Sequence, residues 1–130
     1  MRQVDKNTQV LSHMYNYCDK ISHTIERFGA DFDVFADDSD YVDSISMNIL
    51  QIGELVSKLS DDFITATNHL IPWREMKAMR NFFAHDYGSM NIDIIWETAI
   101  NDIPYVKDFC RPYYEEYQKA CAEIEDTKFD

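Results

Sequence analysis

Apolar side chains in the first half of the chain recur at helical spacing. Between residues 4 and 28 they are separated by steps of three and four, at Leu11, Met14, Cys18, Ile21, Ile25 and Phe28. A second stripe runs from residue 39 to 59, at Tyr41, Ile45, Ile49, Ile52, Val56 and Leu59. This spacing puts all members of a stripe on one face of an α-helix. The pattern predicts two amphipathic helices, the first capped at its C-terminus by Gly29.

The second predicted helix contains the pair Gly53-Glu54 near its centre. Glycine inside a helix costs about 1 kcal/mol relative to alanine, which indicates that another segment packs closely there. Glu54 has two interpretations: it is a solvated residue on the outer face, or it is part of a functional site. The sequence alone favours the first.

Aspartates gather between these two helices, at Asp31, Asp33, Asp37, Asp38, Asp40 and Asp43. A calcium-binding EF-hand loop requires glycine at its sixth position and glutamate at its twelfth. Counted from Asp31, these positions hold Ala36 and Val42. Counted from Asp33, they hold Asp38 and Ser44. We therefore predict a solvated loop over residues 31–43 that caps the next helix.

Prolines and a glycine divide the second half of the chain. After a connection over residues 60–71, Pro72 suits the first turn of a helix over residues 72–87, which ends at Gly88. Asn91 suits the N-cap of a further helix, whose inward positions are Ile92, Ile95, Trp96 and Ala99. Pro104 ends that helix and starts another. Pro112 kinks or divides this last segment, which ends near residue 125.

No segment shows the alternation of a β-strand. The chain has 130 residues, with only three glycines and three prolines, which favours long helices with short connections. We predict an all-α fold, an antiparallel bundle of four to five helices, in a single domain spanning residues 1–130.

Charge and cysteine content restrict the classes of function. The formal net charge of −12 argues against non-specific nucleic-acid binding and against a DNA-binding protein. No signal peptide or membrane-spanning run is visible. The three cysteines, Cys18, Cys110 and Cys121, are odd in number and lack metal-ligand spacing. They predict free thiols in a reducing cytoplasm and no metal site.

Basic residues concentrate in the predicted helix over residues 72–87. Arg74, Lys77 and Arg80 fall within one seven-residue window. On an ideal helix Met76, Met79, Phe82 and Phe83 gather on a core face. Arg74, Asn81 and His85 align on the opposite side with Lys77 beside them, while Arg80 and Tyr87 align at the border of the two faces.

This polar stripe fits the cleavage of RNA by its own 2′-hydroxyl. Arginine suits a phosphate, and a histidine can exchange a proton at neutral pH. Asn81, one turn before His85, could orient the imidazole, and no metal or cofactor is required. Arg80 and His85 point about 140° apart on an ideal helix, so two helices brought together in a two-fold dimer would complete the site. The spacing alone also fits an ordinary helix-end histidine, favoured by the helix dipole.

A longer set of residues narrows these alternatives. The motifs are Pro72-Trp73, Arg80-Asn81, His85, Tyr87, Trp96-Glu97 and Pro104, with Gly53-Glu54 upstream. Together they closely resemble the HepT-like branch of the HEPN family (higher eukaryotes and prokaryotes nucleotide-binding domains), over nearly the whole chain.

The resemblance implies an all-α homodimer that acts as a metal-independent endoribonuclease, with Arg80 and His85 of both subunits lining one cleft. Asn81, Arg74 and Lys77 would support this site. It further implies the toxin half of a toxin–antitoxin pair, acting on RNA such as tRNA or mRNA. The antitoxin would be a nucleotidyltransferase that silences the toxin by transferring AMP to Tyr87.

A second hypothesis comes from the acidity of the chain. In this alternative the dimer is a non-catalytic nucleotide- or protein-binding partner of a minimal nucleotidyltransferase. A purely structural protein is the third interpretation, and it leaves the alignment of Arg74, Asn81 and His85 to chance. His13, His23 and His69 show no partner pattern and are predicted to be surface residues.

Overall fold

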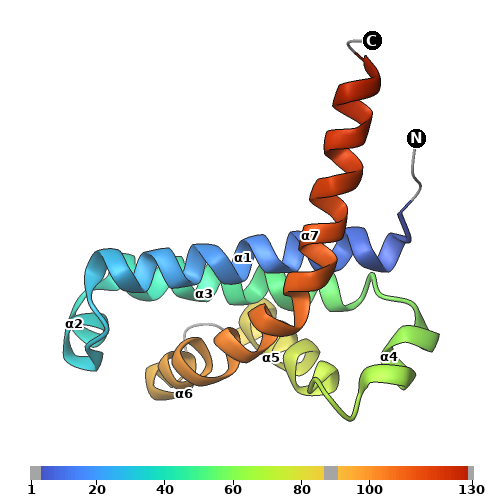
Figure 1. Cartoon of the computed structure of the whole chain (residues 1–130). Coiled ribbons are helices and arrows are strands. Elements are labelled where there is room, and N and C mark those ends of the chain that lie inside the picture. The colour runs from blue at the N-terminus through green and yellow to red at the C-terminus, as the bar shows by residue number, and fades with distance from the viewer. Residues whose placement is uncertain (1–3, 87–90, 129–130) are drawn as a thin grey trace.

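The structure, a computed structural model, describes residues 4–86 and 91–128. The described residues are helical almost throughout, as Figure 1 shows, and form α1 (Lys6–Phe28), α2 (Phe32–Asp37), α3 (Ser39–Val56), α4 (Asp61–Thr67), α5 (Trp73–Asp86), α6 (Ile92–Glu97), the π-helical segment η2 (Thr98–Asp102) and α7 (Ile103–Lys128). The all-α prediction is confirmed. Two short helices, α2 and α4, add to the four to five that were expected.

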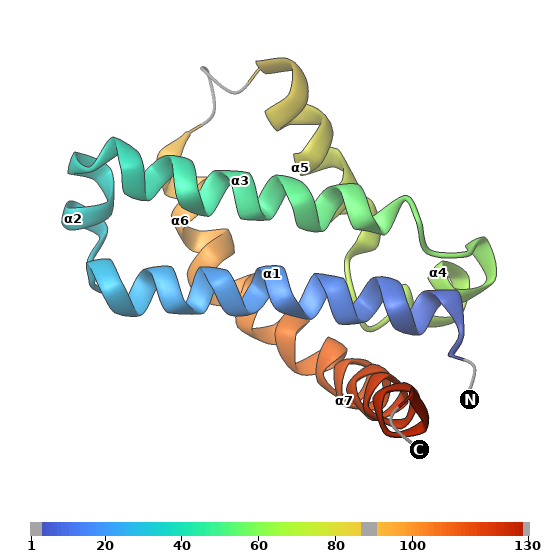
Figure 2. The same ribbon diagram turned by 90° about the horizontal axis from the view of Figure 1, so that it is seen from above.

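Helices α1 and α3 form an antiparallel hairpin along the length of the molecule, as seen from two directions in Figures 1 and 2. The stripe predicted for α1 is buried, and Leu11, Met14, Cys18 and Ile21 are each 0% exposed. Asp5 caps the start of α1 through a 2.9 Å bond from the Asn7 amide. Gly29 ends it with φ of +106°, in the region that favours glycine, and its amide binds the Ile25 carbonyl.

The acidic connector is more ordered than a solvated loop. It folds into α2, and Phe35 on this helix is fully buried against the Tyr41 and Trp96 rings. The aspartates serve the two helix starts: Asp31 accepts bonds from the first amides of α2, and Asp38 does so for α3. The capping role is confirmed, whereas the loop prediction is wrong because Phe35 belongs to the core.

The last part of the chain differs from the division expected at its prolines. Pro104 lies in the first turn of α7, directly after the π-helical turn η2, and the chain stays helical from α6 through η2 into α7. Pro112 lies inside α7, which continues past it. The ring contacts that Phe109 and Tyr113 make with Phe63 hold the helix on both sides of this proline.

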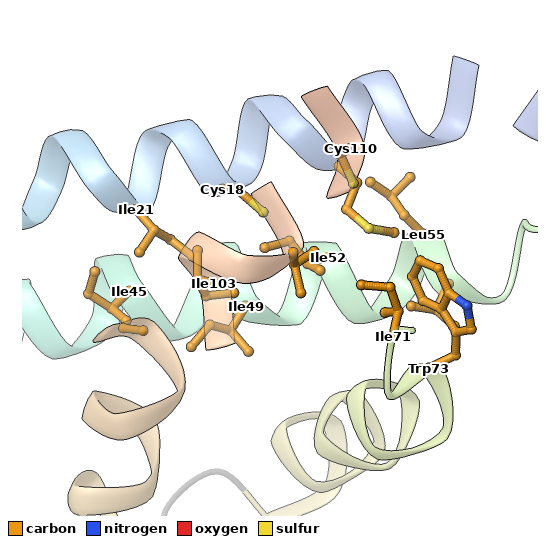
Figure 3. Close-up of a cluster of buried hydrophobic side chains, with 14 of the residues drawn as sticks. Cys18, Ile21, Ile45, Ile49, Ile52, Leu55, Ile71, Trp73, Ile103 and Cys110 are labelled. Carbon is orange, nitrogen blue, oxygen red and sulfur yellow. The ribbon is translucent and has the colours of Figure 1, made fainter. Parts of the chain in front are cut away.

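The core gathers around α3, as the close-up in Figure 3 shows. Ile45, Ile49, Ile52 and Leu55 of α3 meet side chains of α1 and α7, namely Cys18, Ile21, Ile103 and Cys110. Ile71 and Trp73, at the start of α5, close the cluster on a third side. Thus α3 separates α1 from α5 (Figure 2), and the outer side of α5 is left uncovered by the described helices.

Within residues 4–86 and 91–128, no helix combines the length and the apolar character that crossing a membrane requires.

Candidate functional site

Helix α5 is fixed to the core at both ends. At its start, Trp73 is 2% exposed and its indole Nε1 donates a 2.9 Å hydrogen bond to the Thr67 hydroxyl. Near its end, Phe83 is 6% exposed. A helix of this kind is a rigid support for the polar side chains on its other faces.

The expected core face of α5 is correct for three of its four members. Phe83 is buried, and Met76 and Met79 are partly buried against the core. Phe82 is 42% exposed, so its assignment to the core is wrong. It lines an open groove of about 600 Å³ between α5, α6, η2 and α7, where Ile94 and Tyr105 are also exposed.

Arg80 lies where α5 crosses α3. Its Nε donates to the Glu54 carboxylate at 2.5 Å, and its NH1 donates to the Asn81 side-chain oxygen at 2.8 Å. The arginine side chain is 33% exposed and the glutamate 40%. The guanidinium is therefore held by two acceptors, on a side chain that is partly open to solvent.

Gly53 explains why the two helices come so close at this point. A Cβ placed on Gly53 would lie 2.5 Å from Arg80 Cβ and 3.0 Å from the Met76 carbonyl oxygen. Only a residue without a side chain fits such a crossing. The close packing expected at Gly53 is confirmed, and its partner is the helix that carries Arg80.

Glu54 is the residue that the sequence interpretation undervalued. It is half-exposed, as a residue on an outer face would be, but its carboxylate is paired with Arg80. The signal was present in the glycine beside it, since a tight helix crossing at Gly53 brings the next residue against the crossing helix.

The remaining predicted residues are exposed. Asn81 and His85 lie on the outer side of α5, but the Asn81 side-chain oxygen is bound by Arg80, its sequence neighbour. Arg74 and Lys77 border a separate hollow near the start of α5, with Asp61 and Trp73. Tyr87 and Gly88 lie outside the described residues.

The described residues therefore bring together Arg80, Asn81 and Glu54, whereas His85 stands one turn further along α5 on the outer surface. No group of three or more His, Cys, Asp or Glu side chains in the described parts of the chain is placed to hold a metal ion. His13, His23 and His69 are all exposed, as expected.

A second hollow lies on the other side of α5. It measures about 380 Å³ and is lined by Asp43, Ser46, Met47, Leu50 and Phe83. Met47 on its rim is 56% exposed. Exposed apolar side chains thus lie on both sides of the polar stripe of α5.

Comparison with known proteins finds a matching family model and relatives that are named as ribonucleases. Residues 14–113 match the family model described as "Ribonuclease HepT-like". A protein named "Putative RNase" from Caldanaerobacter subterraneus is 30% identical over 94 residues, which cover 72% of this chain and 81% of that protein.

Two archaeal proteins show similar levels of identity. One from Methanocaldococcus jannaschii, also named "Putative RNase", is 34% identical over 73 residues, covering 56% of this chain and 60% of that protein. "Probable ribonuclease HepT" from Thermococcus cleftensis is 38% identical over 56 residues, covering 43% of this chain and 50% of that protein. No solved structure matches the chain.

Proposed function

The chain belongs to the HepT-like ribonuclease family, and on this premise we propose that it is a metal-independent endoribonuclease toxin of the cytoplasm. Arg80 and His85 are its catalytic residues. The observation that carries the proposal is the guanidinium of Arg80, which two side chains hold at a helix crossing, on a side chain that is one-third exposed. A fixed and accessible guanidinium suits the phosphate of an RNA backbone.

The reaction needs no group beyond the RNA and these side chains. The 2′-hydroxyl loses its proton to a base and attacks the neighbouring phosphorus, so that the O2′–P bond forms. The P–O5′ bond breaks, and an acid gives the leaving oxygen a proton. The products are a 2′,3′-cyclic phosphate and a 5′-hydroxyl. The imidazole of His85 transfers protons, and Arg80 stabilises the charge that develops on the phosphorane oxygens.

One chain offers an incomplete set of these groups. Arg80 turns toward α3, whereas His85 lies on the outer surface of α5. We propose that two copies associate about a two-fold axis and place both Arg80–His85 pairs in one cleft. The exposed Phe82 and Met47, on either side of α5, support this assembly, because burial of such apolar side chains drives association.

The family resemblance also suggests how the activity is controlled. We propose a nucleotidyltransferase antitoxin that transfers AMP to the Tyr87 hydroxyl. Tyr87 lies outside the described residues, and its alignment with Arg80, seven positions earlier, is an expectation from an ideal helix alone. An added phosphate there would neutralise the guanidinium, and the nucleotide would occupy the space that RNA needs.

An RNA-cleavage assay tests the proposal. Purified protein is incubated with total tRNA or mRNA in excess EDTA, and its intact mass is recorded to exclude added AMP. We expect His85→Ala to reduce the rate by about 10²–10⁴-fold, as for loss of a general acid or base, and Arg80→Ala to be comparably damaging. His69→Ala and Arg27→Ala are matched controls, since both residues are exposed and neither is part of α5.

The outcomes separate this function from the alternative partner role, which the net charge of −12 favours. Cleavage that survives EDTA and is lost in His85→Ala establishes the metal-independent ribonuclease. Absence of cleavage by wild-type protein of unmodified mass excludes it, and favours a non-catalytic subunit of a nucleotidyltransferase. Toxicity on expression that His85→Ala abolishes would exclude the partner role.

A further inference from the structure

Glu54 is the one acidic side chain of the described residues that binds Arg80. We propose that Glu54 is a positioning residue for catalysis: it holds the Nε edge of Arg80, so that the opposite edge of the guanidinium faces the RNA phosphate. This role rests on the proposed ribonuclease function, in which Arg80 binds the reacting phosphate.

The helix crossing makes Glu54 a fixed support. Glu54 and Arg80 are 26 residues apart in the sequence, on different helices. Because Gly53 has no side chain, the backbone of α3 packs directly against Arg80 Cβ. The same contact between α3 and α5 therefore fixes the backbone that carries Arg80 and the backbone that carries Glu54, which accepts from its Nε. An independent surface pair would lack this constraint.

The hydrogen bonds leave a defined part of the guanidinium for substrate. Arginine has five N–H donors. Glu54 takes the donor on Nε and Asn81 takes one donor on NH1. Neither of these two bonds uses the NH2 group or the second donor on NH1. Two parallel donors of a guanidinium can meet two oxygens of one phosphate.

Two acceptors on different sides also fix the plane of the guanidinium. An arginine side chain free in solution loses rotational freedom when it binds, and that loss opposes the reaction. Here Glu54 and Asn81 have already removed it. A charge stabiliser that is oriented before the substrate arrives costs no reorganisation during the reaction.

The electrostatic and geometric effects of Glu54 oppose each other, which makes the role measurable. A carboxylate near the cleft repels RNA, so its removal will not weaken substrate binding through charge. Its removal will, however, release Arg80 from its orientation. We therefore expect substitution of Glu54 to lower kcat while KM stays the same or falls. The free energy of unfolding will change little, because a half-exposed ion pair contributes little to stability.

The test compares Glu54→Gln and Glu54→Ala with wild type in the EDTA-containing cleavage assay. Glu26→Gln is the matched control, because it removes the same charge from an exposed site on α1. We expect Glu54→Ala to lower kcat by about 10–100-fold. Glu54→Gln, whose amide oxygen can still accept from Nε, will be less affected.

A double-mutant cycle distinguishes positioning from a structural role. In the Arg80→Ala background, Glu54→Ala should change the residual rate by less than about two-fold, because the group through which Glu54 acts is absent. An equal loss in both backgrounds would show that Glu54 acts on the fold, and would overturn the proposal. So would full activity of Glu54→Ala, or a rise in KM at unchanged kcat.

Failure of the proposed function gives a different result. If wild-type protein of unmodified mass does not cleave RNA, the ribonuclease proposal falls and the role of Glu54 falls with it. If wild type cleaves, His85→Ala does not, and Glu54→Ala matches wild type, the ribonuclease stands and the role of Glu54 alone is refuted.

Discussion

The substitution Gly53→Ala tests the crossing on which the site depends. Away from tertiary contacts, this change should stabilise a helix by about 1 kcal/mol. At this position the new Cβ would lie 2.5 Å from Arg80 Cβ and 3.0 Å from the Met76 carbonyl oxygen. Carbon atoms in ordinary contact are roughly 3.5–4.0 Å apart, so the two helices must separate by about 1 Å.

The structure sets both the sign and the size of the effect. Neither atom that the new methyl group meets lies at the flexible end of a side chain, so α5 itself must move. Overpacking of this kind typically costs about 1–3 kcal/mol. After the gain in helix propensity of about 1 kcal/mol is subtracted, we expect a net loss of about 0–2 kcal/mol in the free energy of unfolding.

The assays are thermal unfolding at one fixed protein concentration and RNA cleavage. A loss of 1 kcal/mol lowers the Tm of a domain of this size by about 4 °C. Cleavage should fall further than stability does, since displacing a catalytic group by about 1 Å can cost on the order of 10²-fold in rate. Stability about 1 kcal/mol above that of wild type, together with full activity, would refute the close crossing.

Gly29→Ala is the control for destabilisation alone. Gly29 has a φ of +106°, and no atom lies within 4 Å of the position that a Cβ would take, so an alanine there is strained but does not clash. It lies at the end of α1, away from α5. We expect this variant to lose stability and to keep its cleavage rate while folded.

Three further predictions concern the core. Burial raises the pKa of the Cys18 thiol from 9.0 to about 12 and raises the pKa of the Cys110 thiol as well. Iodoacetamide at pH 8 should therefore modify only Cys121, which is partly exposed. Mass spectrometry of the intact protein would then show one added group. Between about pH 9 and 12 the unfolded chain loses thiol protons that the fold retains, so stability should fall as pH rises through this range. Tyr41→Phe removes the 3.0 Å bond from the buried hydroxyl to the Gly29 carbonyl, and should lower the free energy of unfolding by about 1–2 kcal/mol in urea titrations.

The main helices could be predicted because their residues repeat a simple spacing. Steps of three and four along α1 and α3 place apolar side chains on one face whatever the surrounding structure is. The caps at Asn91 and Gly29 were equally readable, because each satisfies backbone groups within a few residues of itself. Local rules were therefore sufficient for local structure.

Contacts between helices could not be predicted from the sequence in the same way. Phe82 and Phe83 are adjacent and equally apolar, yet one lines an open groove and the other is buried. Their directions differ by about 100° on the helix, and which one meets the core depends on where α3 and α7 lie. Similarly, the acidic connector packs against the core because Phe35 contacts the Tyr41 and Trp96 rings.

The candidate site also combines contacts that local spacing predicts with contacts between residues distant in the sequence. Spacing along one helix aligned Asn81 with His85, but the structure pairs Asn81 with Arg80, because the bond to Glu54 turns the guanidinium toward α3 and its NH1 within reach of the neighbouring amide. Glu54 could have been ranked higher only by treating Gly53 as evidence for a crossing helix. A glycine in an otherwise regular helix thus carries information about residues distant in the sequence.

The charges of α5 suggest how an acidic chain could use an anionic substrate. Arg80 is partly neutralised by Glu54, so it contributes less than a full charge to attracting RNA. Arg74 and Lys77 are exposed and form no ion pair with another described residue. Attraction of the RNA backbone and stabilisation of the reacting phosphate would then belong to different cations of one helix. On this argument, substitution of Arg74 or Lys77 raises KM, most strongly at low salt where charges are least screened, while substitution of Glu54 lowers kcat.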